Sequence, residues 1–350
     1  MSDDLPRRRF LLSAAASVAT MTLAEIPFAA AASQVQDRTG QEQSGSLPYL
    51  PTRQIKTDLL DIEYHETGPE NGHPVILLHG FPYDIHSYVD VAPILAGQGY
   101  RVIVPHLRGH GTTRFLATDT PRSGQQAALG EDLIALMNAL DIPEAVFAGY
   151  DWGGRAACVA AALRPTRCVG LVSVNSYLIQ DIAKASTPLP AHVEWGLWYQ
   201  YYFQTERGRA GLEANRRDIA HILWKNNSPT WHFSEATFER AARAFDNPDY
   251  ADIVVHSYRH RLGLAPGFPQ YEESEKKLAL TPPITVPTIT LDGIADGVIP
   301  ATDGRSSASR FTGPRTHRQI PNAGHNLPQE APKVFADAVA ELARNGKWRT

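Results

Sequence analysis

The sequence predicts an α/β fold: a mostly parallel sheet flanked by helices and interrupted by a helical cap insertion. From about residue 48 the chain alternates short apolar runs with longer amphipathic stretches, which is typical of a parallel sheet with helices on both faces. The runs are bounded by Gly, Pro or Asn, as buried parallel strands usually are. Between about residues 177 and 274 this alternation stops and large aromatic residues accumulate, so a cap insertion is expected there.

Six apolar runs are expected to form the strands. They are residues 75–78, 102–104, 145–148 and 169–174 before the insertion, and residues 288–291 and the weaker 317–320 after it. The core is therefore predicted at residues 48–176 and 275–350, with the cap at residues 177–274. The aromatic rings of the cap should be buried, because a solvated linker could not accommodate so many.

Length and charge exclude several function classes. A chain of 350 residues with 43% hydrophobic content can bury one large core. Its 33 basic and 37 acidic residues give a formal charge of −4, without a basic stripe or an acidic tail. Neither nucleic acid nor a membrane surface is indicated as a partner, and a small neutral organic substrate fits this balance best. Whether the protein forms a homodimer is left open.

The N-terminus has the pattern of a targeting segment. Residues 7–12 read Arg-Arg-Arg-Phe-Leu-Leu and lead into an apolar, alanine-rich run that ends in small residues near Ala32. This resembles a twin-arginine (Tat) signal peptide over residues 1–32, followed by a flexible linker at 33–47. A disordered tail or a membrane anchor is the alternative, and Glu25 interrupts the apolar run. Export to the periplasm or the medium is expected.

The two cysteines indicate neither a disulfide nor a metal site. Cys158 follows closely after the candidate nucleophile described below and Cys168 opens an apolar run, so two buried free thiols are expected. The sequence contains no recognisable metal-ligand cluster, and no cofactor is predicted.

A strand-to-helix turn carries the first candidate catalytic residue. The run 145–148 continues into Gly-Tyr-Asp-Trp-Gly-Gly, with Asp151 at the centre, and then into an alanine-rich helix over residues 155–163. Small residues two before and two after a polar residue permit the tight turn of a nucleophile elbow. A carboxylate there can attack an alkyl carbon and form a covalent ester, whereas lipases and esterases carry serine. The alternative is that Asp151 caps the helix.

A second motif follows the strand at 75–78. The sequence His79-Gly80-Phe81-Pro82, together with the elbow, makes the chain from about residue 48 onwards resemble the epoxide hydrolase and haloalkane dehalogenase branch of the α/β-hydrolases. The resemblance implies an oxyanion hole formed by the backbone N–H groups of Phe81 and Trp152. Simple loop geometry is the alternative explanation of the motif.

A third motif, Leu-Arg-Gly-His-Gly at residues 107–111, also matches the family. The family usually has an aspartate where this chain has His106. We interpret the loop as structural.

The base and its acid should follow the nucleophile in the order acid, then histidine. Asp292 and Asp296 come just after the strand at 288–291, and His325 comes after the strand at 317–320, which places them beyond strand carboxyl ends. Of 13 histidines, only His325 has this order and context. Family spacing favours Asp296 as the orienting acid, while Asp292 could stabilise the turn. The expected triad is thus Asp151, His325 and Asp296.

The cap narrows the expected chemistry. In the resemblance, Tyr199 and Tyr258 match the two tyrosines with which epoxide hydrolases donate protons to the opening epoxide. Packing is the alternative explanation, and it accounts for most of the other rings in this segment.

The sequence therefore predicts hydrolysis of an epoxide to a vicinal diol through an ester on Asp151. A haloalkane dehalogenase would share the triad, but usually has Asn or Glu at the position of Phe81. Haloacetate dehalogenases resemble the chain at Phe81-Pro82 and Arg155, but place an arginine where this chain has Trp152, so a substrate carboxylate would lack half its clamp. A non-catalytic binding protein on the same fold is the remaining alternative.

Overall fold

The computed structural model describes residues 49–349. The predicted signal peptide, residues 1–32, and the predicted linker, residues 33–47, lie outside the described residues.

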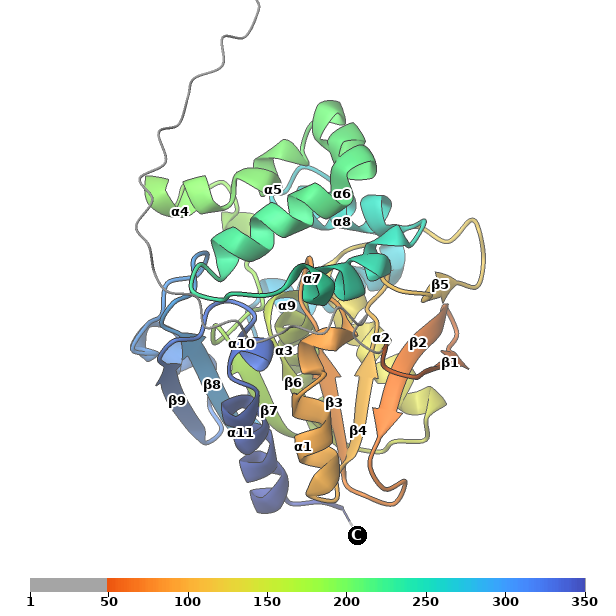
Figure 1. The fold of residues 1–350 in the computed structure, drawn as a ribbon, viewed down its shortest axis with the longest axis vertical. Coiled ribbons are helices and arrows are strands. Elements are labelled where there is room, and N and C mark those ends of the chain that lie inside the picture. Colours follow the sequence, from red (N-terminus) through yellow and green to blue (C-terminus); the bar gives the residue numbers. More distant parts are fainter. Residues whose placement is uncertain (1–48, 350) are drawn as a thin grey trace, which may run out of the picture. The chain divides into compact units, whose positions relative to one another are not determined.

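The described residues contain a nine-stranded sheet in the order β1-β2-β4-β3-β6-β7-β8-β9, with β5 paired to β2 (Figure 1). Strands β3, β4 and β6 to β9 run parallel, whereas β1, β2 and β5 are joined by antiparallel pairing. The strand bounds are β1 Thr52–Lys56, β2 Leu60–Thr67, β3 Pro74–Leu78, β4 Arg101–Pro105, β5 Arg114–Phe115, β6 Ala145–Gly149, β7 Cys168–Val174, β8 Thr288–Gly293 and β9 Arg315–Ile320.

The six predicted strands are confirmed as β3, β4, β6, β7, β8 and β9. Strands β6, β7 and β8 are buried along their whole length, which explains their continuous apolar runs. The antiparallel strands β1, β2 and β5 were not predicted. β1 is mostly exposed and β2 alternates between buried and partly buried positions, so neither has a continuous apolar run.

Helices cover both faces of the sheet (Figure 1). The pair α1 and α11 packs on one face and the pair α2 and α3 on the other. The core helices are α1 Val91–Gly97, α2 Gln126–Ala139, α3 Asp151–Leu163, α9 Glu272–Ala279, α10 Leu327–Glu330 and α11 Pro332–Asn345. Short 3-10 helices connect the elements: η1 Ile85–Tyr88, η2 Pro165–Arg167, η3 Ile182–Lys184, η4 Arg243–Asp246, η5 Pro269–Tyr271 and η6 Arg305–Arg310.

The cap lies above the carboxyl ends of the parallel strands (Figure 1). Its helices are α4 Ala191–Gly196, α5 Trp198–Tyr202, α6 Glu206–Asn227, α7 Glu235–Ala242 and α8 Tyr250–Arg261. Half of its large rings are buried and most of the others are partly buried, but Trp195 is 79% exposed and Tyr201 is 46% exposed. The predicted boundary after residue 274 needs correction, because it falls inside α9, which packs on α2 and α3 as a core helix.

The indole of Trp224 joins the cap to the core. It donates a 2.6 Å hydrogen bond to the Pro82 carbonyl and stacks on the Tyr83 ring at 4.9 Å between centroids. Cap helix α6 is therefore attached to the loop that follows β3.

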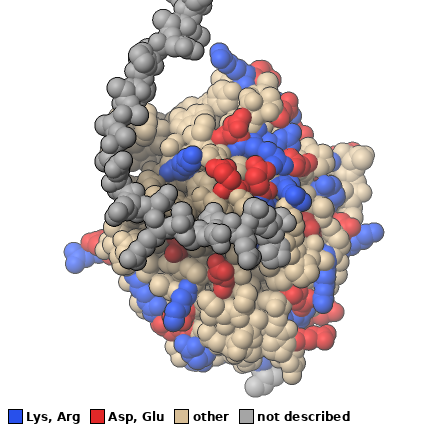
Figure 2. All heavy atoms as spheres, viewed as in Figure 1, with Lys and Arg blue, Asp and Glu red and all other residues tan. Residues whose placement is uncertain are grey.

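Other features concern the surface and the thiols. Basic and acidic side chains are interspersed on the face shown in Figure 2. Within residues 49–349, no helix combines the length and the apolar composition needed to cross a membrane. Cys158 and Cys168 are buried free thiols, as expected.

Candidate active site

Parallel register brings the predicted site residues to one edge of the sheet. Gly149 at the end of β6 pairs with Leu78 of β3 and with Ser173 of β7, and Val174 pairs with Leu291 of β8. The loops that follow these strands consequently meet at their carboxyl ends, beneath the cap.

The elbow has the tight geometry that its glycines predict. Tyr150 is extended, and Asp151 adopts a left-handed backbone with φ 49° before α3 continues. A Cβ on Gly153 would lie 2.0 Å from the Leu78 carbonyl oxygen, and one on Gly80 would lie 2.8 Å from the Asp151 Cβ. The two loops approach so closely that only glycine fits at these positions.

The two oxygens of Asp151 have different surroundings. Oδ1 accepts a 2.7 Å hydrogen bond from the Phe81 N–H, whereas Oδ2 lies 3.8 Å from His325 Nε2. The Trp152 N–H also contributes to lowering the pKa of Asp151. Both N–H groups predicted for the oxyanion hole thus face the carboxylate. The hydrogen bond from Phe81 comes from a different loop, so helix capping does not account for the position of Asp151.

Asp296, rather than Asp292, lies against the histidine. His325 Nδ1 donates a 2.8 Å hydrogen bond to Asp296 Oδ2, to which Asn175 Nδ2 also donates at 3.2 Å. The N–H groups of Val298 and Ile299 donate to Asp296 Oδ1. Asp292 instead accepts hydrogen bonds from the backbone and the hydroxyl of Thr302, so it stabilises the turn.

The charges of Asp151, Asp296 and His325 shift the pKa values of Asp151 and His325. Burial alone would lower the pKa of His325, but Asp296 and Asp151 outweigh it and raise this pKa to about 10. Burial would raise the pKa of Asp151, and hydrogen bonding to His325 together with its charge overrides this and lowers it. In the resting site Asp151 is therefore an ionised carboxylate beside a protonated histidine.

Tyr199 of α5 and Tyr258 of α8 lie next to each other in the cap, with ring centroids 5.4 Å apart. Both rings are within 6.2 Å of the Phe81 ring, and Tyr258 Oη accepts a 3.3 Å hydrogen bond from the Trp152 indole. Burial raises the pKa of each tyrosine, and the charge of Asp151 raises it further. Both hydroxyls stay protonated and can act as donors.

A cavity of about 440 Å³ connects the cap to the nucleophile. Its lining includes Asp151 and Tyr199, and also Arg155 and Arg261. Tyr258 is 1% exposed and lies behind this lining, against Trp152. The cavity thus reaches Asp151 and Tyr199, whereas His325, Phe81, Trp152 and Tyr258 contact these two residues from outside its lining.

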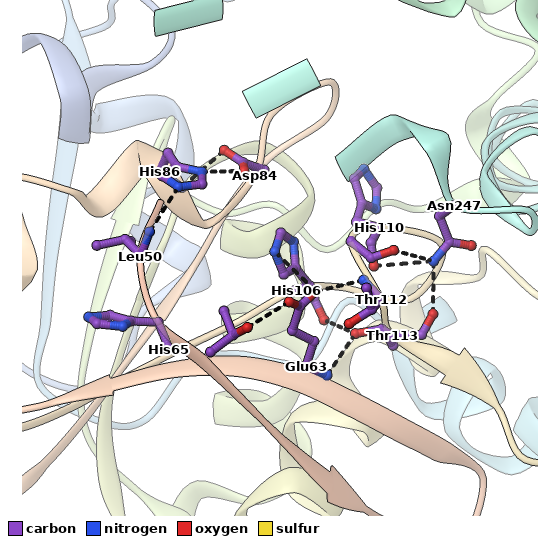
Figure 3. Close-up of polar contacts among 12 residues, drawn as sticks. Leu50, Glu63, His65, Asp84, His86, His106, His110, Thr112, Thr113 and Asn247 are labelled. Atoms are coloured by element: carbon purple, nitrogen blue, oxygen red, sulfur yellow. Dashed lines mark hydrogen bonds and ion pairs between the residues drawn. The ribbon is translucent and has the colours of Figure 1, made fainter. Parts of the chain in front are cut away.

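The loop at residues 107–111 lies behind the site among buried histidines. The His79 ring is 5.9 Å from that of His106 and 4.9 Å from that of His110. Figure 3 shows the polar contacts around this loop, including Glu63, which lies 3.5 Å from His106, and Asn247, which donates to the carbonyl groups of His110 and Thr113. Burial lowers the pKa of all three histidines, so they are neutral. The loop supports the His79–Phe81 segment from behind.

The sequence did not indicate the residues that connect the cap to the loops that carry Asp296 and His325. At the end of α6, the Asn227 carbonyl accepts hydrogen bonds from the N–H groups of Gly297 and His325, and Ser228 Oγ accepts from His325 N–H at 3.1 Å. Ser228 in turn donates to Glu330 at 2.6 Å. No local motif marks Asn227, Ser228 or Glu330. Arg261 could have been noticed, because it lies three residues after Tyr258 on the same helix.

Comparisons with known proteins identify the fold family. Residues 73–332 match the family model described as the alpha/beta hydrolase fold. A solved structure of a proposed epoxide hydrolase from Klebsiella pneumoniae subsp. pneumoniae MGH 78578 is 51% identical, with a TM-score of 0.82, over 84% of this chain and 97% of that one. Epoxide hydrolase A of Mycobacterium tuberculosis is 25% identical over 83% of this chain and 96% of its own. A haloalkane dehalogenase of Psychrobacter cryohalolentis is 29% identical over 87% of this chain and 97% of its own.

These similarities exclude the non-catalytic alternative and identify a hydrolase. The chain belongs to the α/β hydrolase fold family, as one of its epoxide hydrolase-like members.

Proposed function

We propose that this protein hydrolyses an epoxide to a vicinal diol through a covalent alkyl-enzyme ester on Asp151. In the first step Asp151 Oδ2 attacks a ring carbon, the C–O bond breaks, and the hydroxyls of Tyr199 and Tyr258 donate to the oxygen as it becomes an alkoxide. The product of this step is an ester of Asp151 that carries a free hydroxyl group. The proton given to the alkoxide is replaced from His325, which leaves both tyrosines protonated and the histidine neutral.

In the second step His325, oriented by Asp296, takes a proton from water, and the resulting hydroxide attacks the ester carbonyl carbon. The N–H groups of Phe81 and Trp152 stabilise the oxyanion, and the diol leaves as the carboxylate is restored. Ester formation removes the negative charge of Asp151, which had raised the pKa of His325. The pKa of His325 therefore falls, and the histidine is neutral and available as a base at the stage that needs one.

One observation carries this proposal: the two Asp151 oxygens are already divided between the oxyanion hole and the open side. Oδ1 accepts from Phe81 at 2.7 Å, as the carbonyl oxygen of an ester must, while Oδ2 is left for attack near His325. A water-activating carboxylate would not need an oxyanion hole on its own oxygen.

A single-turnover reaction in ¹⁸O-labelled water tests the ester. The first diol should contain oxygen from the enzyme, and the label should then be found in Asp151. The variant His325→Gln should accumulate the ester, detectable as a mass increase equal to the substrate, because only the second step needs the base. Solvent label in the first diol would contradict the ester mechanism.

Dehalogenation is the second candidate, because a haloalkane dehalogenase is among the relatives. It would use Asp151, His325 and Asp296 in the same roles. The Trp152 indole, which could bind a halide, is instead occupied by Tyr258 Oη at 3.3 Å. This contact favours the epoxide. Release of halide from a bromoalkane or from fluoroacetate, faster than the opening of a terminal or an aryl epoxide, would favour the dehalogenase.

A further inference from the structure

Arg155 is a buried cation inside the substrate cavity. It follows Asp151 by one turn of α3, is 8% exposed and lines the cavity of about 440 Å³ that contains the nucleophile. Its Nη1 donates a 2.6 Å hydrogen bond to the Leu178 carbonyl, and its Nε is buried without a hydrogen-bond partner anywhere in residues 49–349. Burying a charge costs free energy unless the charge is paired, so we expect Arg155 to bind an anion.

Arg261 brings a second cation to the same cavity, from the cap. It is the last residue of α8 and lies over the Tyr258 ring, with Cζ 5.2 Å from the centroid. Its Nε donates to Gln180 Oε1 at 2.9 Å, and Gln180 Nε2 donates back to the Arg261 carbonyl at 2.8 Å. These contacts hold the Arg261 side chain against the cavity without neutralising it.

The two arginines influence each other. Burial, followed by the charge of Arg261, lowers the pKa of Arg155 to about 9, and Asp151 opposes this shift. Arg155 is still a cation at neutral pH, but its charged form is less stable than that of a solvated arginine. An anion between the two guanidinium groups would remove this penalty.

The acidic side chains of the cavity are engaged elsewhere. Asp181 pairs with Lys184 at 2.8 Å, and Glu194 accepts hydrogen bonds from Tyr201 and from the Leu189 N–H at the exposed rim. Asp151 and Asp296 share the charge of His325. None of these carboxylates forms an ion pair with Arg155 or Arg261 within residues 49–349, so a single substrate carboxylate could pair with both arginines.

We propose that the substrate is an epoxide that bears a carboxylate, held by Arg155 from the core and Arg261 from the cap while Asp151 attacks the ring. This rests on the proposed function. It replaces the neutral substrate expected from the sequence, because a formal charge of −4 describes the whole chain and not the cavity. Haloacetate dehalogenases place the second cation of their carboxylate clamp where this chain has Trp152. In this proposal Arg261 supplies that second cation instead.

The test compares acids with their neutral amides. The probes are glycidate with glycidamide, and 4-(oxiran-2-yl)benzoate with its carboxamide, which place the carboxylate at two distances from the ring. For at least one pair, wild type should show a kcat/KM about 10- to 100-fold higher for the acid, the range of a charge-assisted hydrogen-bonded pair. The preference should arise mainly in KM.

Three variants assign the preference to the arginines. Arg155→Gln and Arg261→Gln should each reduce the acid-to-amide ratio of kcat/KM by about tenfold or more. Arg305→Gln is the control, because the Arg305 side chain is 90% exposed and does not line the cavity, and it should leave the ratio unchanged. Benzoate should raise the Tm of wild type more than that of the Arg155 or the Arg261 variant, a readout that needs no turnover.

The outcomes separate this inference from the proposed function. Equal turnover of acid and amide by wild type would overturn the carboxylate site and leave epoxide hydrolysis standing. An acid preference that persists in both the Arg155 and the Arg261 variants would also overturn it. If wild type opened none of the epoxides but released halide from 2-haloacids in an arginine-dependent way, the epoxide would be wrong and the carboxylate site would stand. Because Arg155 is buried, the Arg261 variant keeps the test valid if Arg155→Gln does not fold.

Discussion

Ser228 at the end of cap helix α6 donates a 2.6 Å hydrogen bond to Glu330, and the same hydroxyl oxygen accepts from the His325 N–H at 3.1 Å. Glu330 also accepts from the Gly324 N–H at 2.7 Å. A Cβ on Gly324 would lie 2.8 Å from the Ser228 Cα, so the cap and the histidine loop pack closely here. The position of His325 is thus set partly by the cap.

Ser228→Ala and Glu330→Gln should slow the second step selectively. Loss of these hydrogen bonds loosens the loop that carries His325, whereas the Asp151 elbow does not touch them, so ester hydrolysis should fall about tenfold with little change in ester formation. Pre-steady-state kinetics separate the two rates. Ser234→Ala, at the start of α7, is the matched control. Equal loss of both rates would indicate a merely structural role.

The cap tyrosines should affect the first step. Tyr199→Phe and Tyr258→Phe should each lower the rate of epoxide opening by about 10²-fold or more, because the developing alkoxide loses a hydroxyl donor, and the double variant should form almost no ester. Tyr202→Phe, one of the neighbouring rings of α5, serves as the control. Near-wild-type turnover in both single variants would show that these tyrosines only pack the cap.

The raised pKa of His325 should depend on Asp151. Removing the carboxylate charge in Asp151→Asn should lower the pKa of His325 from about 10 towards its ordinary value of 6.5, while Asp296 retains part of the increase. The same change accompanies ester formation, so the rate of ester hydrolysis should rise with pH until this lower pKa is passed. NMR titration of the His325 ring measures the shift, with His325→Gln to assign the signal. Identical titration curves in wild type and Asp151→Asn would contradict the coupling.

The N-terminal segment should direct export and then be removed. The arginine run at residues 7–9 and the small residues before Ser33 lead us to expect a mature N-terminus near residue 33. N-terminal sequencing of periplasmic or secreted protein tests the cleavage. Lysine at all three arginine positions should block export, and unaffected export would count against the signal. Recovery of intact Met1 from the exported fraction would count against cleavage.

The strands that the sequence revealed and those that it hid differ in burial. β6 and β7 are enclosed on both faces, so every residue must be apolar or small and the run is visible in the sequence. β1 carries Arg53 and Lys56 on an exposed edge, and its strand conformation depends on pairing with β2. The limit of the cap was misplaced for a related reason: α9 has helical composition like the cap, and only its packing on α2 and α3 assigns it to the core.

By itself, the sequence determined the six parallel strands, the elbow at Asp151, and the order of acid and histidine after it, because each has a local pattern imposed by backbone geometry or strand burial. Family spacing favoured Asp296 over Asp292, and the structure shows Asp296 against His325. The tertiary structure alone decided that Ser228 binds the histidine loop. It also brought Arg155 and Arg261 to one cavity. These contacts join residues from separate elements, and such contacts depend on how the sheet and cap pack rather than on any local spacing.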